Sequence, residues 1–260
     1  MAAFGVLFAA CNKEEEPAGT NSNQSSTTGS KHIAKITVVS DDYRPESKMS
    51  AKFIWDADKL SYVYINQEGD LWLDASLTYN ETTLQGISAI NYERGHSATY
   101  TPVYNNGKLE NLISNNRDYV SIQYSGNNPT RISDGGDPLS MVWSDGNLCA
   151  IRTMDGNVSF EDFDSQINPL NEVITAIFPN ASKSMHNPVR ATWGEEMTSI
   201  RYEYNDGYPS TGVFNTDEGP MKIYFEYTDG SGSRAPVLDK YTPKRAKNIG
   251  FELLPDFMER

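Results

Sequence analysis

The chain has 260 residues, of which 38% are apolar, and its 35 acidic and 22 basic side chains give a net charge of −13. This length suits one large β domain or two small ones, and the acidic balance excludes a nucleic-acid surface, which needs basic side chains to meet phosphates. The charge also disfavours adsorption to anionic lipid and mainly favours solubility.

The N-terminus has the pattern of a processing and anchoring signal. Residues 1–10 form a short apolar run that ends in small residues immediately before Cys11. This pattern resembles a bacterial lipoprotein signal, in which a peptidase cuts before the cysteine and the thiol is acylated. The residues that follow resemble the export signal of surface-exposed lipoproteins in Bacteroidetes-type bacteria: Lys13, Glu14, Glu15 and Glu16. The resemblance implies lipidation at Cys11, an outer-membrane anchor and display on the cell surface.

The composition divides the chain into three parts. We expect residues 1–11 to be the signal and acylated cysteine, residues 12–31 a flexible polar tether, and residues 32–260 a single β-hairpin-repeat domain. Acylation of Cys11 would leave Cys149 without an intramolecular partner, so no disulfide is expected. Cys149 has no basic neighbour that would activate its thiol, which favours a small packing residue.

One spacing recurs along the body: an aromatic residue, Leu or Pro five positions later, and usually an apolar residue three beyond that. The turn between the first two often contains Asp-Gly or Asn-Gly, which supplies the positive φ of a type I′ β-hairpin. The copies are Trp55/Leu60/Val63, Tyr79/Leu84/Ile87, Tyr104/Leu109/Leu112, Tyr124/Pro129/Ile132 and Trp143/Leu148/Ile151, with a weaker copy Tyr204/Pro209/Gly212 and a copy one residue shorter, Trp193/Met197/Ile200.

The Trp143 hairpin gives the most specific expectation about register. Symmetric pairing about its Asp-Gly turn places Trp143 opposite Leu148, and Met141 opposite Ala150, on one face. Ile151 then lies on the other face unless a bulge intervenes. Apolar residues on both faces predict a sheet that curls or is covered.

Further strands are expected where apolar and polar residues alternate. They lie at Ile33–Ser40, Lys52–Trp55, Leu60–Ile65, Asp70–Tyr79, Ile87–Tyr92, Ala98–Tyr104, Tyr119–Tyr124, Ile200–Tyr204 and Met221–Tyr227. The pattern breaks between Phe160 and Pro188. There, Asn168 as N-cap, Pro169 at the first helical position and helical apolar spacing as far as Ile177 predict one short helix, which packs on a sheet face or plugs an open end.

The unit aromatic–x–[Asp/Asn]–Gly–x–Leu–x–x–Ile resembles a tightened YD repeat, the β-hairpin unit of Rhs-type shells. With the lipoprotein signal and the Asn168-Pro169 insertion, the chain more closely resembles Bacteroidetes lipoproteins that carry a domain of unknown function with a porin-like fold. The resemblance covers about Ile33 to Tyr227. It implies an all-β antiparallel meander of repeated hairpins, rolled into a barrel or half-barrel with one short helix inserted, and it supplies no catalytic residue.

A membrane-spanning porin is not expected, because lipid-facing strands need about 10 alternating residues and most of these runs are shorter. No cofactor or metal is expected either. The histidines His32, His96 and His186 are scattered without metal-ligand spacing, and solvated positions are expected for them. The loops Asp134–Asp137 and Asp217–Gly219 lack the ligand order of an EF-hand and are expected to be plain turns.

Three functions remain open. The first is a non-enzymatic surface lipoprotein that binds a glycan or a protein through exposed aromatic residues on a curved sheet. The candidate ligand-binding aromatics are Trp55, Trp72, Trp143 and Trp193. The second is a carbohydrate-active hydrolase that uses clustered carboxylates, namely Glu161, Asp162 and Asp164, with Glu195 and Glu196 as a further pair. The third is a purely structural envelope protein.

Overall fold

The computed structural model describes residues 31–229 except 41–47, 68, 93–94, 115–116, 135, 146, 155, 167, 183–185 and 217–218. Cys11, the export signal, nearly all of the expected tether and the tail from residue 230 onward lie outside the described residues.

Seventeen strands make up the described body, and they form one antiparallel meander. They are β1 (His32–Ser40), β2 (Lys48–Asp56), β3 (Lys59–Gln67), β4 (Asp70–Asn80), β5 (Thr83–Asn91), β6 (His96–Asn105), β7 (Lys108–Ser114), β8 (Arg117–Ser125), β9 (Asn128–Ser133), β10 (Leu139–Ser144), β11 (Asn147–Thr153), β12 (Gly156–Phe163), β13 (Pro188–Trp193), β14 (Glu196–Ser199), β15 (Arg201–Asn205), β16 (Tyr208–Thr216) and β17 (Gly219–Thr228). The predicted all-β meander is confirmed.

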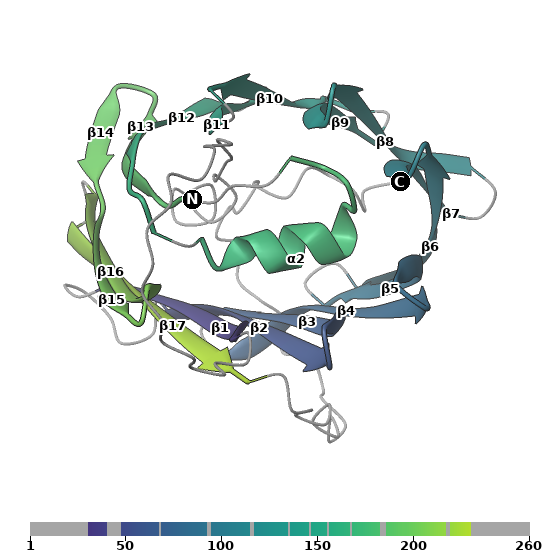
Figure 1. Ribbon diagram of the computed structural model, residues 1–260, viewed down its shortest axis with the longest axis horizontal. Coiled ribbons are helices and arrows are strands. Elements are labelled where there is room, and N and C mark those ends of the chain that lie inside the picture. The colour runs from purple at the N-terminus through teal and green to yellow at the C-terminus, as the bar shows by residue number, and fades with distance from the viewer. Residues whose placement is uncertain are drawn as a thin grey trace, which may run out of the picture.

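The meander rolls into a nearly closed barrel (Figure 1). β17 pairs along β1, with Thr228 opposite His32 and Met221 opposite Ser40. β14 and β15 run in the same direction on either side of Ile200; β14 pairs with β13, and β15 pairs with β16. They therefore act as one bent strand, and this makes the number of alternating directions even, as antiparallel closure requires.

A β-bulge at the tip of six hairpins explains the recurring spacing. In the first hairpin Trp55 pairs with Leu60 and Ile54 with Tyr62, so Ser61 is an extra residue. Because the extra residue shifts the side-chain alternation by one, Leu60 and Val63, three positions apart, both pack into the main core. The same register shift precedes the aromatic residue in the hairpins of Trp55, Tyr79, Tyr104, Tyr124, Trp143 and Tyr204.

Of the two pairings predicted for the Trp143 hairpin, one is confirmed and the other is shifted by the bulge. Trp143 does pair with Leu148, but Met141 lies opposite Ile151, not opposite Ala150. Cys149 is the extra residue of this hairpin, and the shift brings Ile151 into the core with 8% of its surface exposed.

The prediction that Trp193, Met197 and Ile200 form a shortened copy of the repeat is wrong. Trp193 pairs with Glu196 across a tight turn that contains Gly194, and no bulge follows. That turn lies at the other end of the barrel from the repeat turns, and Met197 is 65% exposed instead of packing inward. The resemblance in sequence arose because an aromatic–turn–apolar order suits any hairpin.

The aromatic residue of one hairpin also bonds to the preceding hairpin. The Tyr104 hydroxyl donates to the Leu84 carbonyl (3.1 Å), and the Tyr124 hydroxyl donates to the Leu109 carbonyl (2.7 Å). Trp143 Nε1–H donates in the same way to the Pro129 carbonyl (2.6 Å). The accepting Leu or Pro lies beyond the end of the ladder with the next strand, so its carbonyl would otherwise be left unpaired.

The described helix, α2 (Leu170–Ile177), lies inside the ring of strands (Figure 1). Pro169 already has helical dihedral angles, and the Asn168 side chain accepts a hydrogen bond from the Leu170 backbone N–H (2.8 Å), which confirms the predicted cap. Leu170 and Val173 are buried in the main core, and the helix packs on β1 and β3.

The segment after the helix reaches the opposite wall. Phe178 packs against a second core cluster of Leu109, Val120 and Ile122. Asn180 Nδ2 donates to the Gly107 carbonyl (2.9 Å) at the turn between β6 and β7. The insertion between β12 and β13 therefore crosses the barrel interior and is fixed to both sides, so the barrel surrounds a packed core.

Candidate functional site

The four expected ligand-binding tryptophans all pack against the main core. Trp55 is 4% exposed, and its indole N–H donates to the Ile33 carbonyl (2.8 Å). Trp72, Trp143 and Trp193 are half-buried. Ligand binding by these residues stays a prediction, and the burial of Trp55 makes it the least accessible of the four.

Asp164 closes a loop at the base of the insertion. Its carboxylate accepts hydrogen bonds from the Gln166 N–H (2.9 Å) and from the Asn187 N–H (3.0 Å). The Asn187 side-chain amide (3.3 Å) and the Tyr204 hydroxyl donate to its other oxygen. Burial is the main cause that raises the pKa of Tyr204, and the adjacent Asp164 carboxylate raises it further. Asp164 thus ties the two ends of the insertion to the strand wall.

The neighbouring carboxylates have a different partner. Arg190 on β13 lies 3.7 Å from Glu161 and 2.9 Å from Asp162, and the side chains of all three are well exposed. Glu195, in the turn between β13 and β14, and Glu196, the first residue of β14, are exposed. Of the carboxylates considered for hydrolysis, Asp164 therefore holds a loop, and Glu161 and Asp162 form surface ion pairs with Arg190.

His32 is buried, contrary to the expectation of solvated histidines. It is 6% exposed and stacks on Trp55 with ring centroids 4.7 Å apart. Its ring nitrogens lie 2.8 Å from Glu172 on α2 and 3.3 Å from Asp58 at the β2–β3 turn. Burial raises the pKa of Glu172, and the contact with His32 opposes this shift. His32 thus fixes the helix to the barrel wall.

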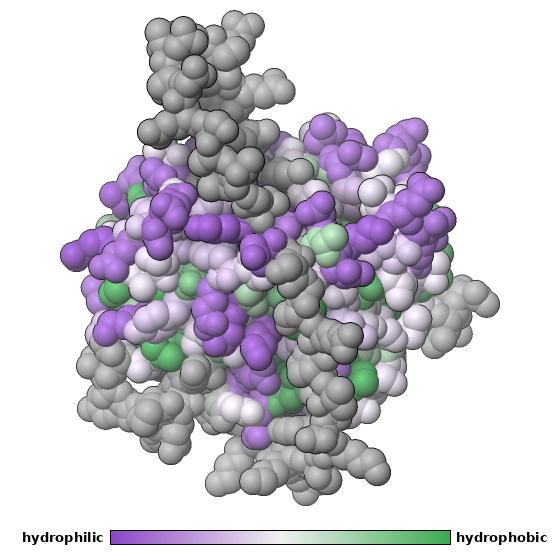
Figure 2. Space-filling view, turned by 60° about the horizontal axis from the view of Figure 1, so that its bottom comes forward, coloured by the Kyte–Doolittle hydropathy of each residue, from purple (hydrophilic) through white to green (hydrophobic). Residues whose placement is uncertain are grey.

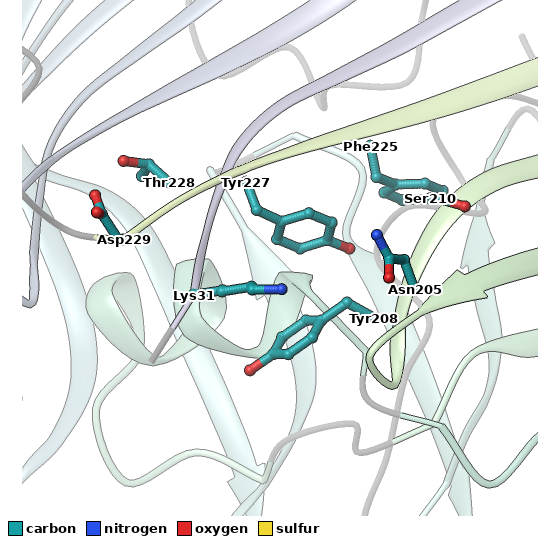
Figure 3. Close-up of a pocket in the computed structure, with 8 residues that line it drawn as sticks. All are labelled: Lys31, Asn205, Tyr208, Ser210, Phe225, Tyr227, Thr228 and Asp229. Atoms are coloured by element: carbon teal, nitrogen blue, oxygen red, sulfur yellow. The ribbon is translucent and has the colours of Figure 1, made fainter. Parts of the chain in front are cut away.

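A pocket of about 320 Å³ opens where β16 and β17 separate, and we call it the fork pocket (Figure 3). The β16–β17 ladder starts with Thr216 opposite Gly219 and stops at Thr211 opposite Tyr224. Beyond that point β16 stays paired only with β15, and β17 only with β1. The pocket is lined by Lys31, Asn205, Tyr208, Ser210, Phe225, Tyr227, Thr228 and Asp229.

Two tyrosines face each other across the fork. The rings of Tyr208 and Tyr227 are in edge contact, with centroids 5.2 Å apart. The Tyr227 hydroxyl donates to the Pro209 carbonyl (2.8 Å), repeating the bond between neighbouring hairpins. Burial, with smaller effects from Tyr208 and Glu172, raises the pKa of Tyr227, so its hydroxyl stays neutral. Phe225 adds a third aromatic wall (Figure 3).

Polar groups complete the pocket. Lys31 Nζ lies 5.8 Å from the centre of the Tyr208 ring and 3.1 Å from an Asp206 carboxylate oxygen. Asn205 and Ser210 add an amide and a hydroxyl from the β15–β16 hairpin. The pocket therefore combines aromatic surface with hydrogen-bonding groups of both kinds and one cation.

Sequence reasoning did not select the fork pocket. The sequence pattern marks the Tyr204/Pro209 hairpin as a weak copy of the repeat and Tyr227 as a strand residue, but no local signal links the two. One signal was present: Tyr208 is an aromatic residue directly after Asp206-Gly207, a position held by Lys or Asn in the Trp55, Tyr104 and Trp143 hairpins.

The described residues contain no group of three or more His, Cys, Asp or Glu side chains that could hold a metal ion. Within the same residues, every helix is too short or too polar to cross a membrane.

No family model matches the chain, and no curated protein matches it. Solved structures do match. A porin-like protein from Bacteroides vulgatus ATCC 8482 is 11% identical with a TM-score of 0.47, over 76% of this chain and 99% of that chain. A porin-like protein from Bacteroides uniformis ATCC 8492 is 11% identical with a TM-score of 0.38, over 75% of this chain and 98% of that chain.

Proposed function

We propose that the protein is a lipid-anchored outer-membrane lipoprotein, displayed on the cell surface, whose barrel binds a glycan at the fork pocket without catalysing a reaction. The anchor and the export signal rest on Cys11 and the Lys-Glu run that follows it. The fork pocket carries the binding proposal.

Glycans need apolar surface for the C–H faces of the sugar ring and polar groups for its hydroxyls. Tyr208, Tyr227 and Phe225 offer the first, while Lys31 and Asn205 offer the second. The volume of about 320 Å³ lies at the small end of the range for small-molecule sites, roughly 300–1,000 Å³. The pocket therefore suits one terminal sugar better than a long chain.

The polar contacts on the outer wall support the proposal that the barrel is surrounded by water. Lys35 on β1 pairs with Glu226 on β17 at 2.5 Å, and Glu203 on β15 accepts a hydrogen bond from Thr211 on β16 at 3.0 Å. Figure 2 shows the wall at the bottom of Figure 1, where most described residues are hydrophilic. A wall in contact with lipid tails would need an apolar band instead.

The first test is a thermal-shift screen of the whole chain against terminal sugars and short oligosaccharides. A ligand at about a hundred times its dissociation constant adds about 2.7 kcal/mol, which raises the melting temperature of a domain of this size by roughly 5–10 °C. Tyr208→Ala should remove the shift. The matched control is Tyr224→Ala, because Tyr224 is 41% exposed on β17 and does not line the pocket.

A shift that survives Tyr208→Ala would refute binding at the fork pocket. If a glycan is cleaved during the screen, and Glu161→Gln or Asp164→Asn stops the cleavage, the hydrolase alternative replaces this proposal. Labelling with a radioactive fatty acid tests the anchor, since Cys11→Ser should abolish the label. Protease treatment of intact cells tests surface display.

A further inference from the structure

A separate cluster of tyrosines lies on the outer wall of the barrel. Ile54 on β2 lies between Phe53 and Trp55, which pack into the main core, so its side chain points outward. Ile54, Tyr64 and Leu71 are buried at 9%, 4% and 8% exposure, and Tyr62 and Tyr92 are half-buried beside them. We call these five residues the tyrosine patch.

The patch presents aromatic rings in a regular arrangement. Tyr62 and Tyr64 are two positions apart on β3, and their rings are parallel within 5° with centroids 5.9 Å apart. Tyr64 is nearly inaccessible and forms the floor, while Tyr62 and Tyr92 keep part of their rings in solvent. Ile90, 39% exposed, extends the apolar surface along β5.

The carboxylate of Asp74 stands beside this patch, and no cation among the described residues pairs with it. Asp74 on β4 lies opposite Tyr64 in the β3–β4 ladder and opposite Ile90 in the β4–β5 ladder. Its side chain is half-buried, and the described residues place no hydrogen-bond donor or cation against it. Burial raises the pKa of the Asp74 carboxyl and of the Tyr64 and Tyr92 hydroxyls, and the Asp74 charge raises the pKa of both tyrosines further.

This differs from other carboxylates of the outer wall. Glu226 is paired with Lys35, and Asp162 with Arg190, although both acids are more than half exposed. A carboxylate that has lost part of its hydration among apolar side chains gains more from a counter-ion than an exposed one does. Asp74, which has no cationic partner among the described residues, therefore stands where a pairing cation would help most.

We propose that Asp74 and the tyrosine patch form a docking site for an arginine side chain of a protein partner. The guanidinium pairs with the carboxylate through two parallel N–H donors and stacks on a tyrosine ring. A planar, weakly hydrated cation fits an aromatic and partly desolvated surface better than the compact lysine ammonium does. The net charge of −13 attracts a basic partner from a distance.

The test uses the full chain and three short peptides that are identical except for a central arginine, lysine or citrulline. Chemical shifts of labelled tyrosine rings report binding as each peptide is added. The arginine peptide should shift the rings of Tyr62, Tyr64 and Tyr92. Citrulline, which keeps the shape without the charge, should bind at least about ten-fold more weakly, and lysine should be weaker than arginine.

Asp74→Asn should weaken the arginine peptide by about ten-fold or more. Asp206→Asn makes the same change of charge beside the fork pocket, and it should alter the dissociation constant less than about two-fold because of distance and screening. Tyr62→Leu keeps the apolar packing and removes the ring, so it should abolish the preference for arginine over lysine.

The proposal is overturned if Asp74→Asn and Asp206→Asn weaken binding equally, if the citrulline peptide binds as well as the arginine peptide, or if none of the ring signals of the patch shifts. The fork pocket is independent of this outcome. Tyr208→Ala should leave arginine binding unchanged, and loss of glycan binding should leave the tyrosine patch intact.

Discussion

Removing a single hydroxyl that joins two hairpins should destabilise the barrel. The Tyr124 hydroxyl donates to the Leu109 carbonyl at 2.7 Å, and Leu109 is 0% exposed. Tyr124→Phe keeps the ring and its packing, but it leaves this carbonyl without its donor. A buried polar group that loses its partner costs about 1–3 kcal/mol, and we expect a loss of about 1–2 kcal/mol in the free energy of unfolding.

Tyr79 provides a matched control within the same repeat. Its hydroxyl is buried but has no hydrogen-bond partner among the described residues, although it holds the position equivalent to Tyr124. Folding removes this hydroxyl from water and gives it no hydrogen bond among the described residues in return. Tyr79→Phe therefore removes a polar group that costs free energy in the folded state. We expect it to be neutral, or to stabilise the protein by up to about 1 kcal/mol.

Urea unfolding followed by tryptophan fluorescence, with thermal melting beside it, measures both variants. For a domain of this size 1 kcal/mol corresponds to roughly 2–4 °C, so a loss of about 1–2 kcal/mol in Tyr124→Phe should lower the melting temperature by about 2–8 °C. Tyr104→Phe repeats the test, since its hydroxyl donates to the Leu84 carbonyl at 3.1 Å. Equal losses of unfolding free energy for Tyr79→Phe and Tyr124→Phe would refute the reasoning, because the loss would then not depend on the hydrogen bond that only Tyr124 makes.

Three further outcomes test the packing, the cap and the titration of the barrel. Gly212→Ala should cost about 1–3 kcal/mol by overpacking, because a Cβ there would lie 3.2 Å from the Tyr202 ring; an unchanged melting temperature would contradict it. Asn168→Ala should cost about 1 kcal/mol by removing the bond to the Leu170 N–H. Asn168→Asp keeps that acceptor but loses the bond from the side-chain amide to the His186 carbonyl (3.4 Å), so it should recover only part of the stability. Burial raises the pKa of Tyr79 and of Tyr124 to about 12. The folded state then binds more protons than the unfolded state above about pH 10, so this contribution to stability is complete below pH 10 and is lost as the pH rises toward 12. A spectrophotometric titration in which every tyrosine ionises near pH 10, while circular dichroism shows an intact fold, would disprove those shifts.

The hairpins could be located from sequence because their signals are local. Asn106 and Gly107 both have positive φ, 49° and 76°, as the predicted turn requires. Asn168 caps α2 through a hydrogen bond to a residue two positions away. The bulge also has a signal in the sequence, namely the three-residue step from Leu60 to Val63. The predicted pairing of Met141 with Ala150 was wrong because it assumed a hairpin without a bulge.

The sequence by itself determined most of the strands, the turns of the repeated hairpins and the inserted helix, because each depends on side chains within a few positions of one another. Only the tertiary structure decided which distant side chains meet. His32 reaches Glu172 across 140 residues, and Asp164 reaches Tyr204 across 40. The fork pocket exists because β17 stays paired with β1 after its pairing with β16 has ended, and this pairing forms only when the barrel closes. Closure depends on the number, tilt and stagger of all the strands together, and no single stretch of sequence carries that information.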